Sequence, residues 1–101
     1  MDDAVKPYLD AQGRVTRWPA RRNRSDRAPL LAYFTSKFES GKIYTEREVN
    51  EILKAHHTFD DWALLRREMV MQGIFGRSSS GSQYWLEKQP DPNLEYTEQE
   101  F

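Results

Sequence analysis

The sequence predicts an α+β domain of the winged helix-turn-helix type, a three-helix bundle with a C-terminal β-hairpin wing and a short N-terminal strand. Two observations and one packing argument predict it. Apolar residues recur every three or four positions in three successive segments between residues 26 and 73, which is the spacing of amphipathic helices. Two short runs of apolar and aromatic residues then flank a serine-rich turn. Each helix must bury its apolar face against another element, so the three helices should form a bundle whose open edge the hairpin covers.

The length of 101 residues fits one domain, which we place at residues 14–87. Residues 1–13 lack apolar periodicity, so we expect a loose N-terminal lead. Residues 88–101 contain two prolines and four acidic side chains but no apolar stripe, which is typical of a disordered acidic tail.

The first predicted element is a short strand in GRVTRWP, residues 13–19, which ends at Pro19 because proline cannot donate to a β ladder. We expect this strand to pair with the hairpin as a third strand of one sheet. The next residues, ARRNRS at 20–25, form a polar basic link.

The first helix is predicted over about residues 26–38. Ser25 or Asp26 can cap it, and Pro29 is tolerated in a first turn, where its missing N–H would have no partner. Its apolar face comprises Leu30, Leu31, Phe34 and Phe38. The second helix has the clearest start, because Thr45 and Glu48 can form a capping box.

The third helix takes Thr58 or Asp60 as its cap. It stops at Gly73, which can adopt the left-handed conformation that often ends a helix. The hairpin follows, with residues 74–77 and 83–87 as its arms.

Four segments, GRVTRWP, LLAYFTSKFESGKIYTEREVNEIL, LLRREMVMQGIFGR and YW, together resemble a small prokaryotic domain-of-unknown-function family (number twenty eighty-seven). The resemblance covers about residues 13–86. It implies a winged-helix-like fold. Because some members are joined to DNA-binding regulator modules, it also implies a role in transcription regulation. It carries over no activity and no functional residue.

The charges are unevenly distributed, although the formal net charge is only −1. Residues 14–27 hold six arginines and one aspartate between acidic ends. Guanidinium groups suit phosphate and give salt-dependent affinity without sequence preference. The predicted nucleic-acid-binding residues are four arginines of this segment with one on the third helix and one on the wing: Arg17, Arg21, Arg22, Arg24, Arg67 and Arg77. The alternative is a solvated linker whose charges pair with the acidic ends.

The third helix is poorly suited to reading bases. Asp60 and Asp61 at its start interact favourably with the helix terminus, but they would repel the phosphates of a duplex that approaches there. Leu64 and Met71 on its outward face suit contact with another protein or a second copy of the chain. The alternative is that the wing or a tail covers them.

Two other groups of side chains are interpreted as structural. Arg66 lies close to the core face and is expected to pair with Glu48 or Glu51. His56 and His57 could suggest a metal site, but adjacent helical residues point about 100° apart. We therefore expect His56 at the edge of the core and His57 exposed.

The composition excludes several function classes. The chain has no cysteine, which rules out disulfide and thiolate chemistry and fits the cytoplasm. No apolar run is long enough to span a bilayer, and no catalytic constellation is present. We expect no enzyme, no metal, no cofactor and no membrane partner.

Two hypotheses follow. The first is a transcription-regulator-type winged helix that binds DNA through the arginine-rich strand and linker and through the wing. The second is a winged helix used as a protein-interaction or dimerisation module without DNA binding.

Overall fold

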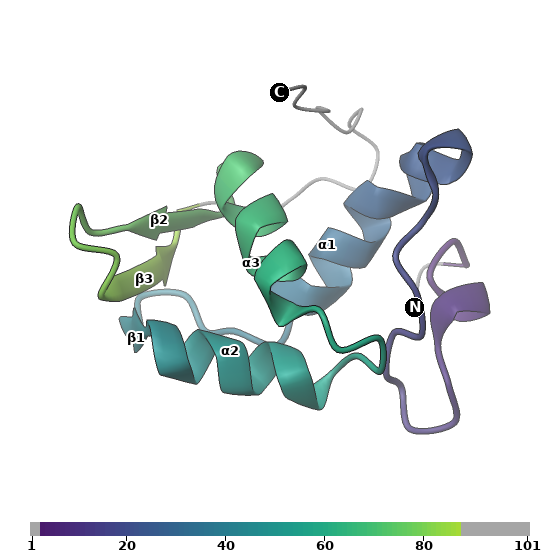
Figure 1. Cartoon of the computed structure of the whole chain (residues 1–101), viewed down its shortest axis with the longest axis horizontal. Helices are drawn as coiled ribbons and strands as arrows, with labels where there is room; N and C mark the ends of the chain where they lie inside the picture. The colour runs from purple at the N-terminus through teal and green to yellow at the C-terminus, as the bar shows by residue number, and fades with distance from the viewer. Residues whose placement is uncertain (1–2, 88–101) are drawn as a thin grey trace.

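The computed structural model describes residues 3–87, which form three α-helices and a three-stranded antiparallel sheet (Figure 1). The arrangement is winged-helix-like and confirms the predicted fold class. The elements in chain order are the 3₁₀ turns η1 (Lys6–Tyr8) and η2 (Arg21–Asp26), then α1 (Arg27–Thr35), β1 (Tyr44–Thr45), α2 (Glu46–Ala55), α3 (Trp62–Met71), β2 (Phe75–Arg77) and β3 (Gln83–Leu86).

One apolar core joins the helices and the hairpin. Phe34 of α1, Leu53 of α2 and Leu65 of α3 are all completely buried. Tyr84 of β3 packs in the same cluster. Full burial of a large apolar side chain contributes about 1.5–3 kcal/mol, so this shared core supplies much of the free energy that holds the short helices together.

The third strand of the sheet is not the predicted one. β1 takes that place, in the order β1-β3-β2. Residues 13–19 form no strand, and Val15 makes only isolated bridges, one of them to His57. The Val15 N–H donates to the His56 carbonyl at 2.9 Å, and the Val15 carbonyl accepts from the Thr58 N–H at 2.9 Å. Because the turn between α2 and α3 uses both backbone groups, this segment does not join the hairpin.

Residues 3–13 pack on the domain, whereas the sequence suggested a loose lead. Val5 and Tyr8 are 2% and 3% exposed and belong to the core. The Tyr8 carbonyl accepts from the Thr16 hydroxyl at 2.8 Å, and the Tyr8 hydroxyl donates to Asp26 at 2.7 Å. Asp26 therefore ties the N-terminal segment to the start of α1 and does not cap the helix with its side chain. The predicted tail at residues 88–101 lies outside the described residues.

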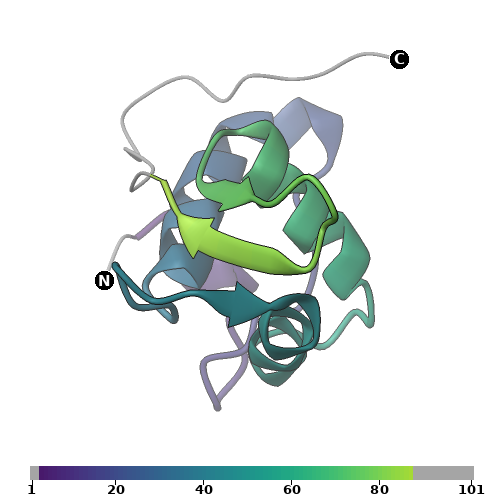
Figure 2. The same cartoon turned by 90° about the vertical axis from the view of Figure 1, so that its left-hand side faces the viewer.

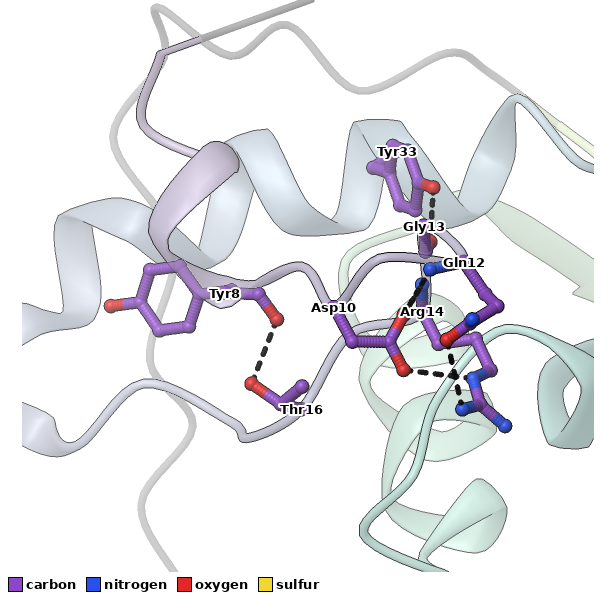
Figure 3. Close-up of polar contacts among 7 residues, drawn as sticks. All are labelled: Tyr8, Asp10, Gln12, Gly13, Arg14, Thr16 and Tyr33. Carbon is purple, nitrogen blue, oxygen red and sulfur yellow. Dashed lines mark hydrogen bonds and ion pairs between the residues drawn. The ribbon is translucent and has the colours of Figure 1, made fainter.

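Side chains close the loop at residues 10–14 (Figure 3). The Asp10 carboxylate accepts from the backbone N–H groups of Gln12 at 3.0 Å and Arg14 at 2.8 Å. These bonds, led by the one from Arg14, hold the pKa of Asp10 below its ordinary value. Gly13 has a φ of +78°, and its carbonyl accepts from the Tyr33 hydroxyl of α1. The loop is thereby fixed against α1.

The helix starts follow the predictions in part. The capping box of α2 is confirmed: the Thr45 N–H donates to Glu48 Oε1 at 2.8 Å, and the Glu48 N–H donates to Thr45 Oγ1 at 3.1 Å. α3 is capped by Asp61, one residue later than predicted, through a bond of 3.2 Å from the Leu64 N–H. Asp60 has a φ of 55° and lies before the helix.

The wing has the predicted arms, and Gly76 has a packing role in it. Gly76 lies opposite Trp85 in the ladder between β2 and β3. A Cβ at position 76 would lie 2.6 Å from Cε2 of the indole and 2.7 Å from a Glu87 oxygen. Glycine therefore makes room for an aromatic ring that packs across the strand.

Candidate interaction groove

A groove of about 450 Å³ runs along α3 and ends at the wing. Figure 1 shows α3 beside β2 at the sheet end of the molecule. The groove is lined by seven residues from the start and body of α3 and by one from β2: Asp61, Ala63, Leu64, Arg66, Arg67, Val70, Met71 and Arg77.

The apolar part of the groove follows from helical spacing. Leu64, Arg67 and Met71 are three and four residues apart, so they lie on one face of α3. Leu64 and Met71 are half-buried, and Val70 is packed against the core from the same stretch. The predicted protein-interaction residues therefore share one concave surface, and residues 3–87 leave both partly open to solvent.

Arg66 is structural, as expected, but its partners differ from those predicted. Its guanidinium lies 3.6 Å from the Glu46 carboxylate and donates to the Asn50 side chain. Glu46 also accepts from the Tyr84 hydroxyl at 3.3 Å. The predicted partner Glu48 is instead used by the capping box. Arg66 thus joins α3 to α2, and its side chain is only 22% exposed.

Arg67 and Arg77, unlike Arg66, are exposed and lack a side-chain partner among residues 3–87. Both are exposed, and both line the groove. Among residues 3–87 neither makes a hydrogen bond, an ion pair or a ring contact. Two guanidinium groups that hold five donors each are therefore available to an incoming carboxylate or phosphate.

The N-terminal end of the groove is acidic. The Asp61 carboxylate caps α3 and lines the groove at the same time. In a helix-turn-helix protein that reads DNA, this end of the helix approaches the major groove. A carboxylate that is already bonded to the helix terminus opposes the approach of phosphates there.

The other predicted nucleic-acid-binding residues lie far from the groove. Arg21, Arg22 and Arg24 belong to η2, at the opposite end of the longest axis from the wing (Figure 1). Viewed from the sheet, η2 lies behind the helices (Figure 2). Arg17 donates to the Pro7 carbonyl at 3.3 Å, and its guanidinium carbon lies 4.3 Å from the centre of the Tyr8 ring. The six arginines therefore do not form one continuous surface.

Residues 14–86 match the family described as "Uncharacterized protein conserved in bacteria (DUF2087)". The chain belongs to this family. No curated protein and no solved structure matches the chain significantly. All residues of the groove fall within the part that matches the DUF2087 family.

The histidines of this DUF2087 domain are structural. His57 is only 6% exposed, so the expectation of an exposed side chain is wrong. Its ring packs 4.6 Å from the Phe59 ring and bonds to the backbone at both nitrogens. Within residues 3–87 no three histidine, cysteine or acidic side chains are grouped so that they could hold a metal. No helix in that range has the length and apolar character needed to cross a membrane.

Sequence reasoning missed two groove residues, Val70 and Ala63. Val70 packs against the core and also lines the groove. It lies three residues after Arg67, so the same helical spacing also placed it beside the groove stripe.

Proposed function

We propose that this domain is a winged-helix protein-interaction module whose α3–β2 groove binds a partner segment with an apolar side chain between carboxylates. One observation carries the proposal: the half-buried Leu64 and Met71 share one groove with the guanidinium groups of Arg67 and Arg77, which are unpaired among residues 3–87. We place this activity in the cytoplasm because the chain carries no cysteine.

The chemistry of the groove favours such a ligand over a duplex. Burial of Leu64 and Met71 beneath a partner side chain removes apolar surface from water, which is favourable by about 25 cal/mol per Å². Arginine pairs with carboxylates through two parallel hydrogen bonds, which adds orientation to affinity. A face that reads bases would carry asparagine, glutamine or serine where α3 carries leucine and methionine.

A peptide selection tests the proposal. A library of random peptides is selected on the whole chain, and peptides that also bind a Leu64→Glu/Arg67→Glu variant are discarded. We expect the remaining peptides to contain a large apolar residue flanked by Asp or Glu. Their affinity, measured by fluorescence anisotropy, should fall about tenfold or more in either single variant, as a loss of 1.4 kcal/mol or more would give.

Two matched variants outside the groove serve as controls. Ile43→Glu introduces the same charge at a side chain that is 58% exposed, and Arg47→Glu reverses a charge on the exposed face of α2. Both should leave binding unchanged. If the controls weaken binding as much as the groove variants do, the proposed function is wrong.

A second candidate is sequence-independent DNA binding through η2. The observation that favours it is that Arg21, Arg22 and Arg24 are all exposed within a six-residue turn. It predicts that a short fluorescent duplex of random sequence binds with an affinity that falls steeply with salt. Replacing the three arginines by glutamine should abolish binding, while the same change at Lys42, Arg47 and Lys54 should not. A duplex that binds both variants equally rejects this candidate.

A further inference from the structure

The chain itself contains a segment with the chemistry that the groove requires. Residues 88–101 read KQPDPNLEYTEQEF, with four carboxylates and one lysine. Leu94 and Tyr96 flank Glu95 directly, and Glu98 follows two residues after Tyr96. Tyr96 therefore lies between the carboxylates of Glu95 and Glu98 in the sequence. This is the pattern that the proposed function assigns to a ligand.

We propose that residues 91–101 of the same chain occupy the α3–β2 groove and exclude other ligands until they are displaced. This inference rests on the proposed function, since it names the first occupant of that site. Carboxylates of the segment pair with Arg67 and Arg77, while Leu94 or Tyr96 covers Leu64 and Met71.

The end of the described chain places the segment near the groove. Glu87 donates its N–H to the Ile74 carbonyl at 2.7 Å. Ile74 lies in the short connection between α3, which ends at Met71, and β2, which begins at Phe75. The chain therefore leaves the fold at the junction of the two elements that line the groove.

The length of the segment is sufficient. Fourteen residues follow Glu87, and they can extend roughly 45 Å at about 3.3 Å per residue. The longest dimension of the molecule is 35 Å. A tethered segment of this length reaches an effective concentration on the order of millimolar, so even weak intrinsic affinity fills the site.

The charges favour this groove over a second concavity formed by the described residues. That second site, of about 300 Å³, is lined by Lys42, Tyr44, Arg47, Glu48, Glu51 and Ile52. Its two carboxylates offset its two cations, so an acidic segment gains little there. In the α3–β2 groove, Arg67 and Arg77 are both unpaired within residues 3–87, and Asp61 is already bonded to the helix start.

A spin label tests the proposal on the whole chain. The chain has no cysteine, so Gln99→Cys introduces a single attachment point for a nitroxide. We expect the nitroxide to remove most of the NMR signal intensity of the Leu64, Met71 and Arg77 amides. The Arg67→Glu/Arg77→Glu variant should restore these signals, and so should Glu95→Gln/Glu98→Gln. The matched variant Arg21→Glu/Arg22→Glu, at the far end of the domain, should leave the signal loss unchanged.

Two outcomes overturn the inference without touching the proposed function. Groove signals that keep their intensity beside the nitroxide, in a protein that still binds the selected peptides, show that the segment is not the occupant. Equal signal loss in a mixture of ¹⁵N-labelled chain and unlabelled spin-labelled chain shows contact between copies instead of within one chain. If the groove binds neither the segment nor any selected peptide, both proposals fail together.

Discussion

The His57 ring connects the end of α2 to the start of α3 through Asp61. Its Nε2 lies 3.0 Å from the Asp61 backbone nitrogen and accepts from that N–H. Its Nδ1 lies 2.6 Å from the Leu53 carbonyl, so it must carry the hydrogen that this carbonyl accepts. The ring thereby bonds to both backbone groups and positions Asp61, which caps α3 and lines the groove.

We expect His57→Leu to destabilise the domain by about 1–3 kcal/mol, because it leaves the Asp61 N–H without its partner inside the fold and removes one of the two hydrogen bonds to the Leu53 carbonyl. Urea unfolding followed by circular dichroism measures the loss. His56→Gln is the matched control, since His56 is only half-buried, and it should change stability by less than about 0.5 kcal/mol. An equal loss in both variants contradicts this account of the turn.

Without the Glu48 carboxylate, the free energy of unfolding should decrease less as the pH falls. The pKa of Glu48 is held below its ordinary value of 4.5, mainly because the Thr45 N–H donates to the carboxylate. A pKa that is lower in the folded state gives stability that is present above the unfolded value and is lost as the pH falls through the folded value. The urea midpoint of Glu48→Gln should therefore fall less than that of the wild type between neutral pH and about pH 3.

Glu51→Gln is the control for this experiment. The Glu51 carboxylate lies 3.7 Å from the exposed Lys54 on the outer side of the same helix. Its substitution should leave the acid dependence of the wild type intact. A Glu48→Gln variant with the full wild-type acid dependence shows that the capping box does not contribute to it.

Gly76→Ala should distort the wing. The new Cβ would lie 2.6 Å from Cε2 of the Trp85 ring, which is closer than non-bonded carbon atoms approach, so the indole must move. We expect a loss of about 1–3 kcal/mol, the usual cost of overpacking, together with a changed near-ultraviolet circular dichroism signal. Gly81→Ala meets no atom within 4 Å but must hold a φ of +76°. It should cost about 1 kcal/mol and leave the tryptophan signal unchanged.

Asp10→Ala should open the loop at residues 10–14. The substitution removes the acceptor for the Gln12 and Arg14 backbone N–H groups, so hydrogen exchange at both amides should become faster. Tyr33→Phe removes only the bond to the Gly13 carbonyl and should leave these two amides protected. Unchanged exchange in Asp10→Ala would mean that the backbone bonds of the loop hold it without the side chain.

Patterns that depend on neighbours in sequence predicted much of the fold. Helical spacing identified the buried faces of the three helices, and the spacing of Thr45 and Glu48 identified the start of α2. Features that depend on distant partners were not predictable in this way. β1 has only two residues, and nothing local distinguishes it from the cap of the following helix. The local pattern around Val15 predicted a strand. Its actual partner, His57, lies in the turn after α2, about forty positions away, so no local pattern could indicate it.

The candidate site was predicted residue by residue but not as one surface. Helical spacing placed Leu64, Arg67 and Met71 on one face of α3, and composition identified Arg77 on the wing. The angle between α3 and β2 brings these residues together, and core packing sets that angle. The partner of Arg66 was missed for a similar reason: Glu48 and Glu51 were the predicted partners, whereas the crossing of the two helices selects Glu46.

The two backbone bonds of Val15 have a consequence for the order of events during synthesis. A ribosome releases residues 5–16 long before it releases His56 and Thr58, the residues to which Val15 is bonded. The N-terminal segment must therefore wait, with Val5 and Tyr8 exposed to water, until the end of α2 and the following turn have emerged. This segment is expected to close over the helices only after that turn has emerged, and a stalled chain that ends before residue 56 should be vulnerable to proteases within residues 5–16.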